Sequence, residues 1–250
     1  MEEIAFWSTF AADMSIQQEI FDRTLLLVGE QAMERICKAK VIIFGVGGVG
    51  SWVAEALVRS GIMQLTLVDS DFICMSNVNR QCPATTKTVG EVKVEAMKTR
   101  LLEINPEAKV EAIQAIYSAE TSASFHLEDF DYVIDAIDSL EHKAELIRHA
   151  TSLPRHVRFF SSMGAALKID PTQIRVDEFW KVKGCPLARA LRQKFKRSHR
   201  FPSRKFQVVY SPELLTQAPR GHVNGTVVHV TAIFGFTLAG LVVQDICKEV

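Results

Sequence analysis

The sequence predicts an α/β protein with a doubly wound, mostly parallel sheet and a C-terminal α+β extension. Short apolar segments alternate with helical patterns through the first two-thirds of the chain, and each segment is apolar almost throughout. Such segments are typical of parallel strands covered on both faces. A glycine-rich loop joins the first of them to a helix. The 250 residues are 48% hydrophobic and 23% charged, which is ordinary for a globular chain able to bury a core.

The first two-thirds of the chain is expected to supply five parallel strands and the helices that connect them. The expected strands are residues 40–44, 64–69, 109–116, 132–138 and 158–162. Apolar residues recur at helical spacing before and between these strands. The expected helices are residues 26–38, 49–60, 89–104, 119–125 and 139–151.

The pattern changes after Pro171. A strand over 174–180, a helix over 186–197, a strand over 205–210 and a final helix over 227–248 are expected. No internal repeat or low-complexity linker divides the chain. We therefore expect residues 1–250 to form one domain. It has a core over about 21–165, a basic segment over about 181–205 and an apolar helix over about 226–248.

Charge and cysteine content exclude some classes of protein. Lys plus Arg and Asp plus Glu are both 29, which argues against a uniformly basic nucleic-acid binder. The five cysteines form no CxxC pair, so no zinc site is expected and a reducing compartment is indicated. The acidic start MEEIAFWSTF does not have the pattern of a signal peptide. A cytoplasmic location is expected.

One segment leaves a second location open. Residues 226–244 are uncharged apart from the titratable His229, and their length is close to that of a bilayer span. Membrane association through 226–246 is one interpretation. A buried or subunit-interface helix is favoured, because no flanking basic loop would orient a span.

The glycines Gly45, Gly47, Gly48 and Gly50 lie between the first expected strand and the next helix. Glycines here permit a tight turn and close approach to a phosphate, which the helix N-terminus also attracts. Asp69, at the end of the next strand, can accept hydrogen bonds from a ribose. A Rossmann-like nucleotide site is therefore predicted, although this loop does not separate NAD from ATP, and a merely structural turn is the alternative.

Polar residues after Asp69 favour ATP over NAD. Phosphoryl chemistry needs cations around the reacting phosphate, and Arg80 and Lys93 can supply them. For either residue alone, a solvated surface charge is the alternative. The residues expected to join them are Asp71, Asn77, Asn79 and Gln81.

Two carboxylates end the fourth expected strand. Asp138 is placed to hold Mg²⁺, a hard cation that prefers carboxylate and phosphate oxygens. Capping of the helix that follows is the alternative for this residue. Asp135 is expected to orient the loop from inside.

Four motifs together carry a resemblance: GVGGVGS, VDSDFICMSNVNRQ, GEVKVEA and DAIDS. The chain resembles the ubiquitin-activating-like (ThiF- and MoeB-type) adenylating superfamily. Within it, the stretches RTLLLVGEQAM, KIDPTQIRV and FGFTLAGLVVQDI are similar to the family of tRNA threonylcarbamoyladenosine dehydratases. Activators of ubiquitin-like sulfur carriers normally have two CxxC pairs, which this chain lacks.

The resemblance implies roles for residues at matching positions. Asp69 and Asp71 would hold the ribose of ATP with support from Asn79, and Arg80 and Lys93 would bind its phosphates. The full set of implied ATP-binding residues is Gly45, Gly47, Gly48, Gly50, Ser51, Asp69, Asp71, Asn77, Asn79, Arg80, Gln81, Lys93 and Asp138, with Mg²⁺ on Asp138.

The resemblance also implies a homodimer. Arg23 matches the position of an arginine that reaches the ATP of a neighbouring subunit, so the implied catalytic residues are Arg23, Arg80, Lys93 and Asp138. A cysteine desulfurase or a sulfur-acceptor protein is a further partner that the resemblance suggests.

A basic segment lies hidden in the neutral total. Residues 181–205 contain ten Lys or Arg and no Asp or Glu, whereas the other 225 residues have a net charge of −10. Such a segment is typical of phosphate contacts, here with tRNA; a solvated surface helix is the alternative. The expected tRNA-binding residues are Lys181, Lys183, Arg189, Arg192, Lys194, Lys196, Arg197, Arg200, Arg204 and Lys205.

The function expected from these features is ATP-dependent dehydration of threonylcarbamoyladenosine beside the tRNA anticodon, through an acyl-adenylate that closes into a ring. Cys185, at a helix start, has the position of a nucleophile, but the ring closure needs no enzyme thiol. Two alternatives stay open. They are adenylation of the C-terminus of a ubiquitin-like sulfur carrier and a non-catalytic or NAD-binding role.

Overall fold

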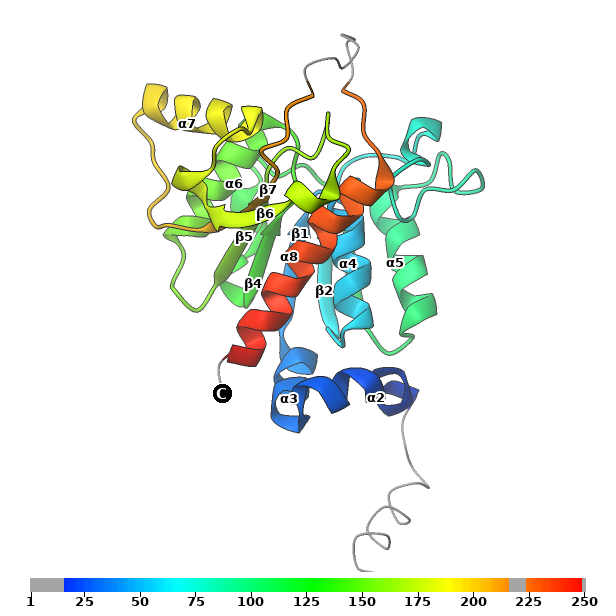
Figure 1. Ribbon diagram of the computed structural model, residues 1–250. Coiled ribbons are helices and arrows are strands. Elements are labelled where there is room, and N and C mark those ends of the chain that lie inside the picture. Colours follow the sequence, from blue (N-terminus) through cyan, green and yellow to red (C-terminus); the bar gives the residue numbers. More distant parts are fainter. Residues whose placement is uncertain (1–15, 216–223, 249–250) are drawn as a thin grey trace, which may run out of the picture.

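A seven-stranded sheet runs through the centre of the molecule, in the order β3-β2-β1-β4-β5-β7-β6 (Figure 1). The computed structural model describes residues 16–215 and 224–248. Every neighbouring pair is parallel except β6 with β7. The strands are β1 (Lys40–Phe44), β2 (Gln64–Val68), β3 (Lys109–Ile113), β4 (Tyr132–Asp135), β5 (Arg158–Ser162), β6 (Arg175–Glu178) and β7 (Gln207–Tyr210). The predicted fold class is confirmed.

The strand order reverses beside β1, which pairs with β2 on one side and with β4 on the other. Phe44, the last residue of β1, is in register with Val68 and with Asp135. The loops that follow β1, β2 and β4 therefore begin at the same edge of the sheet. Ligands of doubly wound folds bind at this position.

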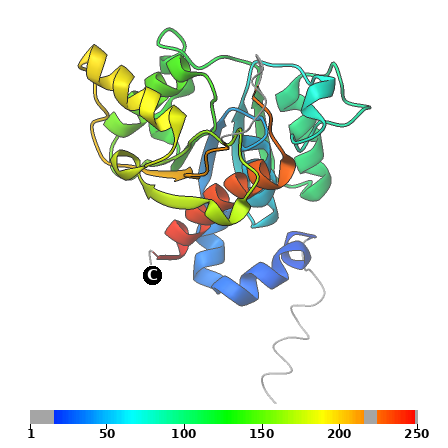
Figure 2. The same ribbon diagram turned by 45° about the horizontal axis from the view of Figure 1, so that its top comes forward.

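Helices cover both faces of the sheet (Figure 2). One face packs on α3 (Glu30–Lys38), α4 (Gly50–Arg59), α5 (Lys93–Ile104) and α8 (Val228–Lys248), and the other on α6 (Leu140–Ser152) and α7 (Pro186–Ser198). Side chains alternate along β1, so Val41 and Ile43 join the first core while Ile42 and Phe44 join the second.

The long C-terminal helix α8 lies against α4. At Gly235 a Cβ atom would be only 2.7 Å from Cβ of Trp52 and from the carbonyl oxygen of Val49, so the two helices approach more closely than a side chain would allow. In the described part of the chain, α8 is the helix whose length and hydropathy would suffice to cross a membrane, and half of its apolar window is buried.

Two helices differ from the prediction at their ends. The helix expected over 26–38 is two helices, α2 (Ile16–Val28) and α3, because Gly29 between them has a φ of 80°. The helix expected over 89–104 begins only at Lys93. The preceding residues turn back on the loop after β2, where Lys93 N donates to the Asp71 carbonyl and Phe72 bridges to Val92.

The connection from β3 to β4 contains no α-helix, so the helix expected over 119–125 was wrong. It consists of two 3₁₀ turns, η2 (Ser122–Phe125) and η3 (Leu127–Asp129), which meet at a left-handed His126. The strand expected over 174–180 is shorter than predicted, because β6 ends at Glu178. The 3₁₀ turns η4 (Pro171–Gln173) and η5 (Phe179–Lys181) flank it. A further 3₁₀ turn, η1 (Met75–Asn77), follows β2.

A buried carboxylate joins α4, α5 and the loop after η1. Glu55 accepts hydrogen bonds from Arg59 on its own helix and from Nε and Nη2 of Arg100. It also accepts from the Cys82 thiol at 2.8 Å. Burial by itself would raise the pKa of Glu55, but these hydrogen bonds lower it to about 2. Burial and the Glu55 carboxylate raise the pKa of Cys82 to about 12, so its thiol stays protonated and acts as a donor.

Glu55 makes the stability of the fold depend on pH. Its pKa is below the ordinary value of 4.5, so its contribution is complete above about pH 4.5 and is lost as the pH falls through about 2. Glu55→Gln should lower the free energy of unfolding at pH 7, as measured by denaturant unfolding. The free energy of unfolding of this variant should also fall less than that of the wild type between about pH 4.5 and about pH 2. The exposed Glu95→Gln is the matched control. Equal pH dependence of wild type and Glu55→Gln would contradict this role.

Candidate nucleotide-binding site

A cavity of about 1080 Å³ lies at the edge of the sheet where the strand order reverses. Its walls come from the glycine loop, the loops after β2, β4 and β5, and the start of α8. The structure brings ten of the predicted site residues to this cavity: Gly45, Gly47, Gly48, Asp69, Asp71, Asn77, Arg80, Gln81, Lys93 and Asp138. Gly50, Ser51 and Asn79 are not among the residues that line it.

The glycine loop is shaped by contacts that leave no room for side chains. Gly45 has a φ of 88°, and a Cβ atom there would be 2.7 Å from the Ala136 carbonyl oxygen. At Gly50 a Cβ atom would be only 1.8 Å from the Gly45 carbonyl oxygen. These two glycines close the turn, which leaves Gly47 and Gly48 on the cavity wall.

Two predicted residues hold the walls together. The Ser51 hydroxyl donates to the Gly47 carbonyl at 2.6 Å and accepts from the Cys82 amide. The Asn79 side chain donates to the Thr226 carbonyl at 3.1 Å, which ties the loop after η1 to the segment before α8. Both therefore position other parts of the site, and their contact with a nucleotide stays a prediction.

Asp69 is the centre of the site's hydrogen bonding. Its carboxylate accepts from Val46 N in the glycine loop at 2.7 Å and from Asp71 N at 2.9 Å. The buried Lys93 ammonium lies 3.2 Å from Asp69 Oδ1 and 2.9 Å from Asp71 Oδ2. The predicted ribose-binding carboxylates and the predicted phosphate-binding lysine are thus already paired with one another.

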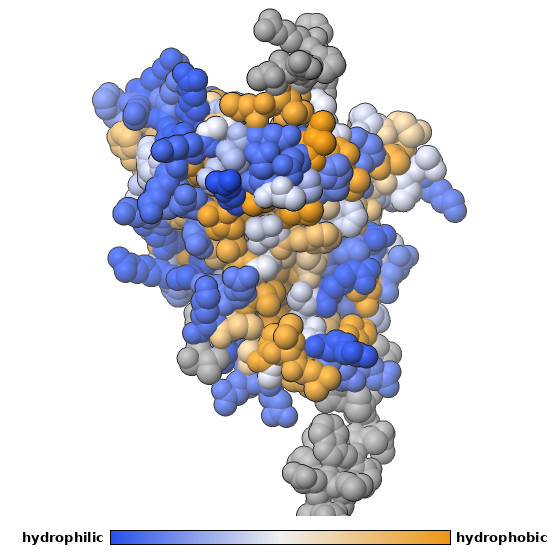
Figure 3. All heavy atoms as spheres, in the orientation of Figure 1, coloured by the Kyte–Doolittle hydropathy of each residue, from blue (hydrophilic) through white to orange (hydrophobic). Residues whose placement is uncertain are grey.

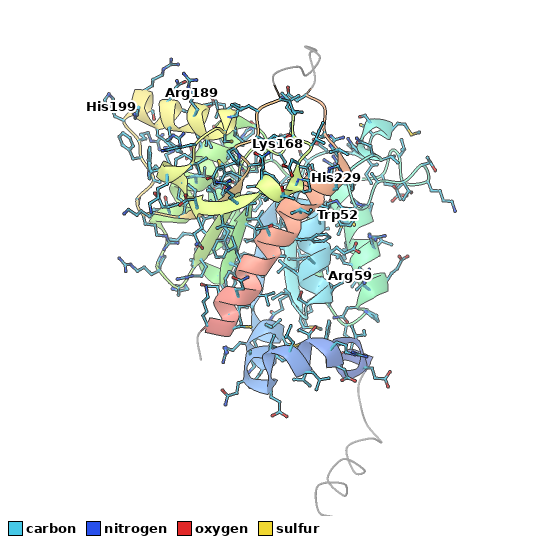
Figure 4. All side chains as sticks on the ribbon, viewed as in Figure 1. Trp52, Arg59, Lys168, Arg189, His199 and His229 are labelled. Carbon is cyan, nitrogen blue, oxygen red and sulfur yellow. The ribbon has the colours of Figure 1, made fainter. Side chains whose placement is uncertain are left out.

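Arg80 and Gln81 line the cavity beside Gly47 and Gly48. Arg80 Nη1 donates to the Ser76 carbonyl and to Asn79 Oδ1, while the Trp52 indole donates to the Arg80 carbonyl at 3.0 Å. Figure 4 shows Trp52 on the α4 side of α8, near the loops of the upper edge. The backbone at Arg80 is therefore anchored to α4.

Gln81 carries an unpaired polar atom. Its side chain is only 7% exposed, and its Oε1 has no hydrogen-bond partner among the described residues. Buried polar groups are rarely left unsatisfied, because doing so costs about 1–3 kcal/mol. Gln81 Oε1 can only accept, so a ligand group with an N–H or O–H donor, such as those of a nucleoside, would satisfy it.

The loop that carries Asp138 rests on a fully buried ion pair. Lys143 Nζ lies 2.8 Å from Asp135 Oδ2 and donates to the Ile137 carbonyl at 2.8 Å. Asp135 also accepts from the Ser161 hydroxyl and from Ile137 N. Burial raises the pKa of Asp135, whereas Lys143 and the two hydrogen bonds act in the opposite direction. Lys143 has no signal in the sequence, because a lysine in a helix is ordinarily at the surface.

Asp138 itself is exposed on the cavity wall. The described residues include no group of three or more His, Cys, Asp or Glu side chains that could hold a metal ion together. Mg²⁺ commonly binds one or two protein carboxylates and completes its shell with phosphate oxygens and water. The single carboxylate of Asp138, facing a cavity where ATP phosphates are expected, therefore fits a Mg²⁺ ion.

Arg23 is far from the cavity of its own chain. It lies exposed on α2, which precedes α3 and the amino end of β1, whereas the cavity is at the carboxyl ends of the strands. Figure 1 shows α2 and α3 at the lower end and the cavity-forming loops at the upper end.

The basic segment divides into structural and exposed side chains. Arg204 donates to four carbonyls around the end of α6, Arg192 donates to the Phe179 carbonyl, and Lys194 pairs with Glu141. These three side chains are thus engaged within the fold. The exposed members are Lys181, Lys183, Arg189, Lys196, Arg197, Arg200 and Lys205.

Part of the cavity comes from residues that no motif marked. The backbone after β5 contributes Met163, Gly164, Ala165 and Ala166, and Leu187 in the first turn of α7 lies against Gly164. These small and apolar residues give no local signal of a site. The cavity therefore continues from the glycine loop to the start of the basic helix.

Cys185 is the residue before α7, and its side chain is 3% exposed within the core beneath that helix. A nucleophile must reach its substrate, and this burial does not provide such access. This position does not favour Cys185 as a nucleophile, although its place before a helix suggested one.

Lys143 should be required for the stability of the Asp138 loop. Lys143→Met would leave Asp135 buried without its counter-charge, so the free energy of unfolding should fall by about 3 kcal/mol or more. Asp135→Asn combined with Lys143→Met should recover part of this loss. Denaturant unfolding would measure both, with Lys98→Met on α5 as the control. A change of less than about 0.5 kcal/mol in Lys143→Met would show that the pair is dispensable.

Comparison with known proteins assigns the chain to a family. The ThiF family matches residues 21–249. The tRNA threonylcarbamoyladenosine dehydratase of Bacillus subtilis is 35% identical over 246 residues, covering 92% of this chain and 95% of that protein.

Two further relatives differ in how much of the chain they match. The structure of Escherichia coli tRNA N6-threonylcarbamoyladenosine dehydratase in complex with ATP is 35% identical, with a TM-score of 0.84 and coverage of 93% of this chain and 95% of that one. The molybdopterin-synthase adenylyltransferase of Haemophilus influenzae is 30% identical over 161 residues, covering 63% of this chain and 64% of that protein. The chain belongs to the ThiF family.

Proposed function

We propose that this protein is an ATP-dependent tRNA threonylcarbamoyladenosine dehydratase. The observation that carries the proposal is the continuous cavity from the glycine loop to the start of α7. One end offers Gly47, Gly48 and Asp138 to a nucleoside triphosphate, and the other end opens beside the basic helix. The Bacillus subtilis dehydratase matches 92% of the chain, whereas the molybdopterin-synthase adenylyltransferase matches 63%.

The chemistry has two steps. The side-chain carboxylate of threonylcarbamoyladenosine attacks the α-phosphorus of ATP, and the bond to the β-phosphate oxygen breaks to release pyrophosphate. A nitrogen of the same side chain, losing its proton, then attacks the activated carbonyl and AMP leaves. The oxygen lost from the carboxylate leaves with AMP, so the ring product contains one water fewer. Because nucleophile and carbonyl belong to one side chain, proximity replaces an enzyme thiol.

The residues of the cavity have distinct tasks in this scheme. Arg80 and Lys93 offset the charge of the phosphates, and Asp69 and Asp71 accept from the ribose hydroxyls. Lys93 lies between those two carboxylates at 2.9–3.3 Å, so it can turn toward a phosphate while remaining near them. Mg²⁺ bound to Asp138 would neutralise phosphate oxygens, and Gln81 would donate to or accept from the nucleotide.

The tRNA binds along α7 in this proposal. Leu187 in its first turn is on the cavity wall, and exposed cations continue along the helix and beyond it. Arg189 and His199 mark its two ends on the outer surface at the upper left of Figure 4. Phosphates held along this helix would leave the modified nucleoside at the cavity mouth.

A second copy of the chain is proposed to complete each site. Helix α2 exposes Leu26 and Leu27 to 83% and 85%, and Ile20 to 38%, with Arg23 on the same helix. Figure 3 shows apolar surface at this lower end and along the centre of the same face, where α8 exposes Phe236. Such apolar surface would be covered in a homodimer, which would carry Arg23 to the partner's cavity. The protein is then a cytoplasmic enzyme with α8 in its interior and interface.

ATP–pyrophosphate exchange tests the proposed function. Exchange should be stimulated by tRNA bearing threonylcarbamoyladenosine without any added carrier protein. Asp138→Ala should lower it at least about a hundredfold, because the metal that neutralises the phosphates is lost. Asp129→Ala, an exposed aspartate away from this cavity, is the control. Exchange that needs a carrier protein and ignores tRNA would support the carrier-activating alternative instead.

Mixing two inactive variants tests the donation of Arg23 between subunits. Arg23→Ala and Lys93→Ala should each be inactive, and subunit exchange should form mixed dimers with one intact site. Activity should then return to about a quarter of the wild-type value, since half the dimers are mixed and each has one working site of two. Complete subunit exchange without recovery would place Arg23 in the site of its own chain or outside catalysis.

A further inference from the structure

Two exposed aromatic side chains lie together beside α7. Trp180 in η5 is 37% exposed and Phe201, just beyond α7, is 49% exposed. Their ring centroids are 6.3 Å apart with an interplanar angle of 43°. Neither residue lines the nucleotide cavity. We call this pair the aromatic surface.

The aromatic surface rests on a packed base. Trp180 lies edge-on against the fully buried Phe179, which stacks on Phe206 at 5.0 Å. Arg192 of α7 donates to the Phe179 carbonyl at 3.1 Å, and its guanidinium lies 5.8 Å from the centre of the Phe179 ring. The backbone that carries Trp180 is therefore attached to the middle of the basic helix, and the surface is formed before any partner binds.

Exposed cations lie close to both aromatic residues in the sequence. Lys181 and Lys183 follow Trp180, and Arg197 and Arg200 precede Phe201; all four are exposed, and none forms an ion pair with another described residue. These cations leave the surroundings of the aromatic pair positively charged.

The two nearby carboxylates are occupied by the backbone. Asp177 Oδ1 accepts from Glu178 N at 2.7 Å, and Glu178 Oε1 accepts from Trp180 N at 3.2 Å. They therefore hold η5 in place, and neither pairs with a basic side chain in the described structure.

We infer that the aromatic surface stacks an unpaired nucleobase of the tRNA loop, a nucleotide other than the one that reacts in the cavity. The rings of Trp180 and Phe201 can stack on a nucleobase, and the nearby exposed lysines and arginines can contact phosphates. Single-stranded RNA offers both groups. Phosphate contacts along α7 would set the register of the RNA, and the stacked base would distinguish an open loop from a duplex. This inference rests on the proposed function, because it assumes that RNA binds along α7.

The separation between cavity and aromatic surface suits a single RNA loop. Leu187 touches the cavity, and Arg192, which contacts Phe179, comes five residues later on the same helix. Five helical residues span about 7.5 Å. Stacked nucleotides rise about 3.4 Å each, so this distance along the axis of α7 corresponds to about two nucleotides. The stacked base would therefore lie at least about two nucleotides from the reacting nucleoside, within the same loop.

RNA-binding measurements with Trp180→Leu and Phe201→Leu test the inference. The probe is an RNA hairpin with an anticodon stem and loop, compared with a fully paired duplex of the same length. Each variant should bind the hairpin about fivefold to about a hundredfold more weakly, while duplex binding and the salt dependence stay unchanged. Trp180→Phe and Phe201→Tyr, which keep an aromatic ring, should retain most of the affinity. Thermal unfolding confirms that all variants are folded.

A charge variant and abasic RNA complete the design. Lys181→Gln combined with Arg200→Gln should weaken hairpin and duplex alike and reduce the salt dependence. Removing the stacked base from the hairpin should weaken binding to wild type but not to Trp180→Leu, and this identifies the nucleotide. If wild type binds no RNA, the proposed function fails. If RNA binds and the charge variant weakens it while Trp180→Leu and Phe201→Leu do not, only the stacking inference is overturned, and the surface serves another macromolecule.

Discussion

The arrangement of the site depends on the carboxylate of Asp69. This residue directly follows β2, and its carboxylate accepts hydrogen bonds from Val46 N of the glycine loop, from Asp71 N of its own loop and from the Lys93 ammonium at the start of α5. Three chain segments that are separate in the sequence meet at this one group. Because the Lys93 side chain is almost fully buried, its charge needs these carboxylates as partners. The loops that would surround a nucleotide are thereby held at one edge of the sheet.

A second layer of contacts fixes the walls to the helices behind them. Trp52 binds the Arg80 backbone, and Ser51 joins the glycine loop to Cys82, whose thiol is held by Glu55. The last quarter of the chain also takes part, because Asn79 binds the segment before α8 and Gly235 lets α8 pack closely on α4. The cavity is therefore a property of the whole fold, and a change in α8 can alter a loop that lies far from it in the sequence.

The two ends of the molecule present different surfaces. The upper end has the cavity and the exposed cations of α7, and the lower end has α2 with exposed leucines around Arg23. In a single copy, Arg23 lies away from the cavity and the leucines of α2 are exposed. Pairing of two copies would bring Arg23 to the partner's cavity and cover the leucines. The exposed cations of α7 would stay accessible to RNA. These surfaces are thus compatible with a dimer that binds RNA on each subunit.

The sequence alone determined the strands of the doubly wound sheet, since short apolar segments separated by helical patterns have few other solutions. It also determined which loops meet, because glycines and acids at strand ends converge wherever parallel strands end together. Boundaries that depend on distant partners were beyond it. The start of α5 at Lys93 is set by a contact with Asp71, and the helix expected over 119–125 gave way to 3₁₀ turns between β3 and β4.

Only the tertiary structure decided which polar residues face the cavity and which face inward. Ser51 and Asn79 hold walls, Arg204 binds backbone carbonyls, and Lys143 is buried against Asp135, although each of these residue types is common at surfaces. The direction of a side chain depends on how helices and loops pack, and local sequence contains little of that information. The sequence also does not show that Trp180 and Phe201 are neighbours. They are separated in the chain by α7, and the tertiary structure brings their rings together.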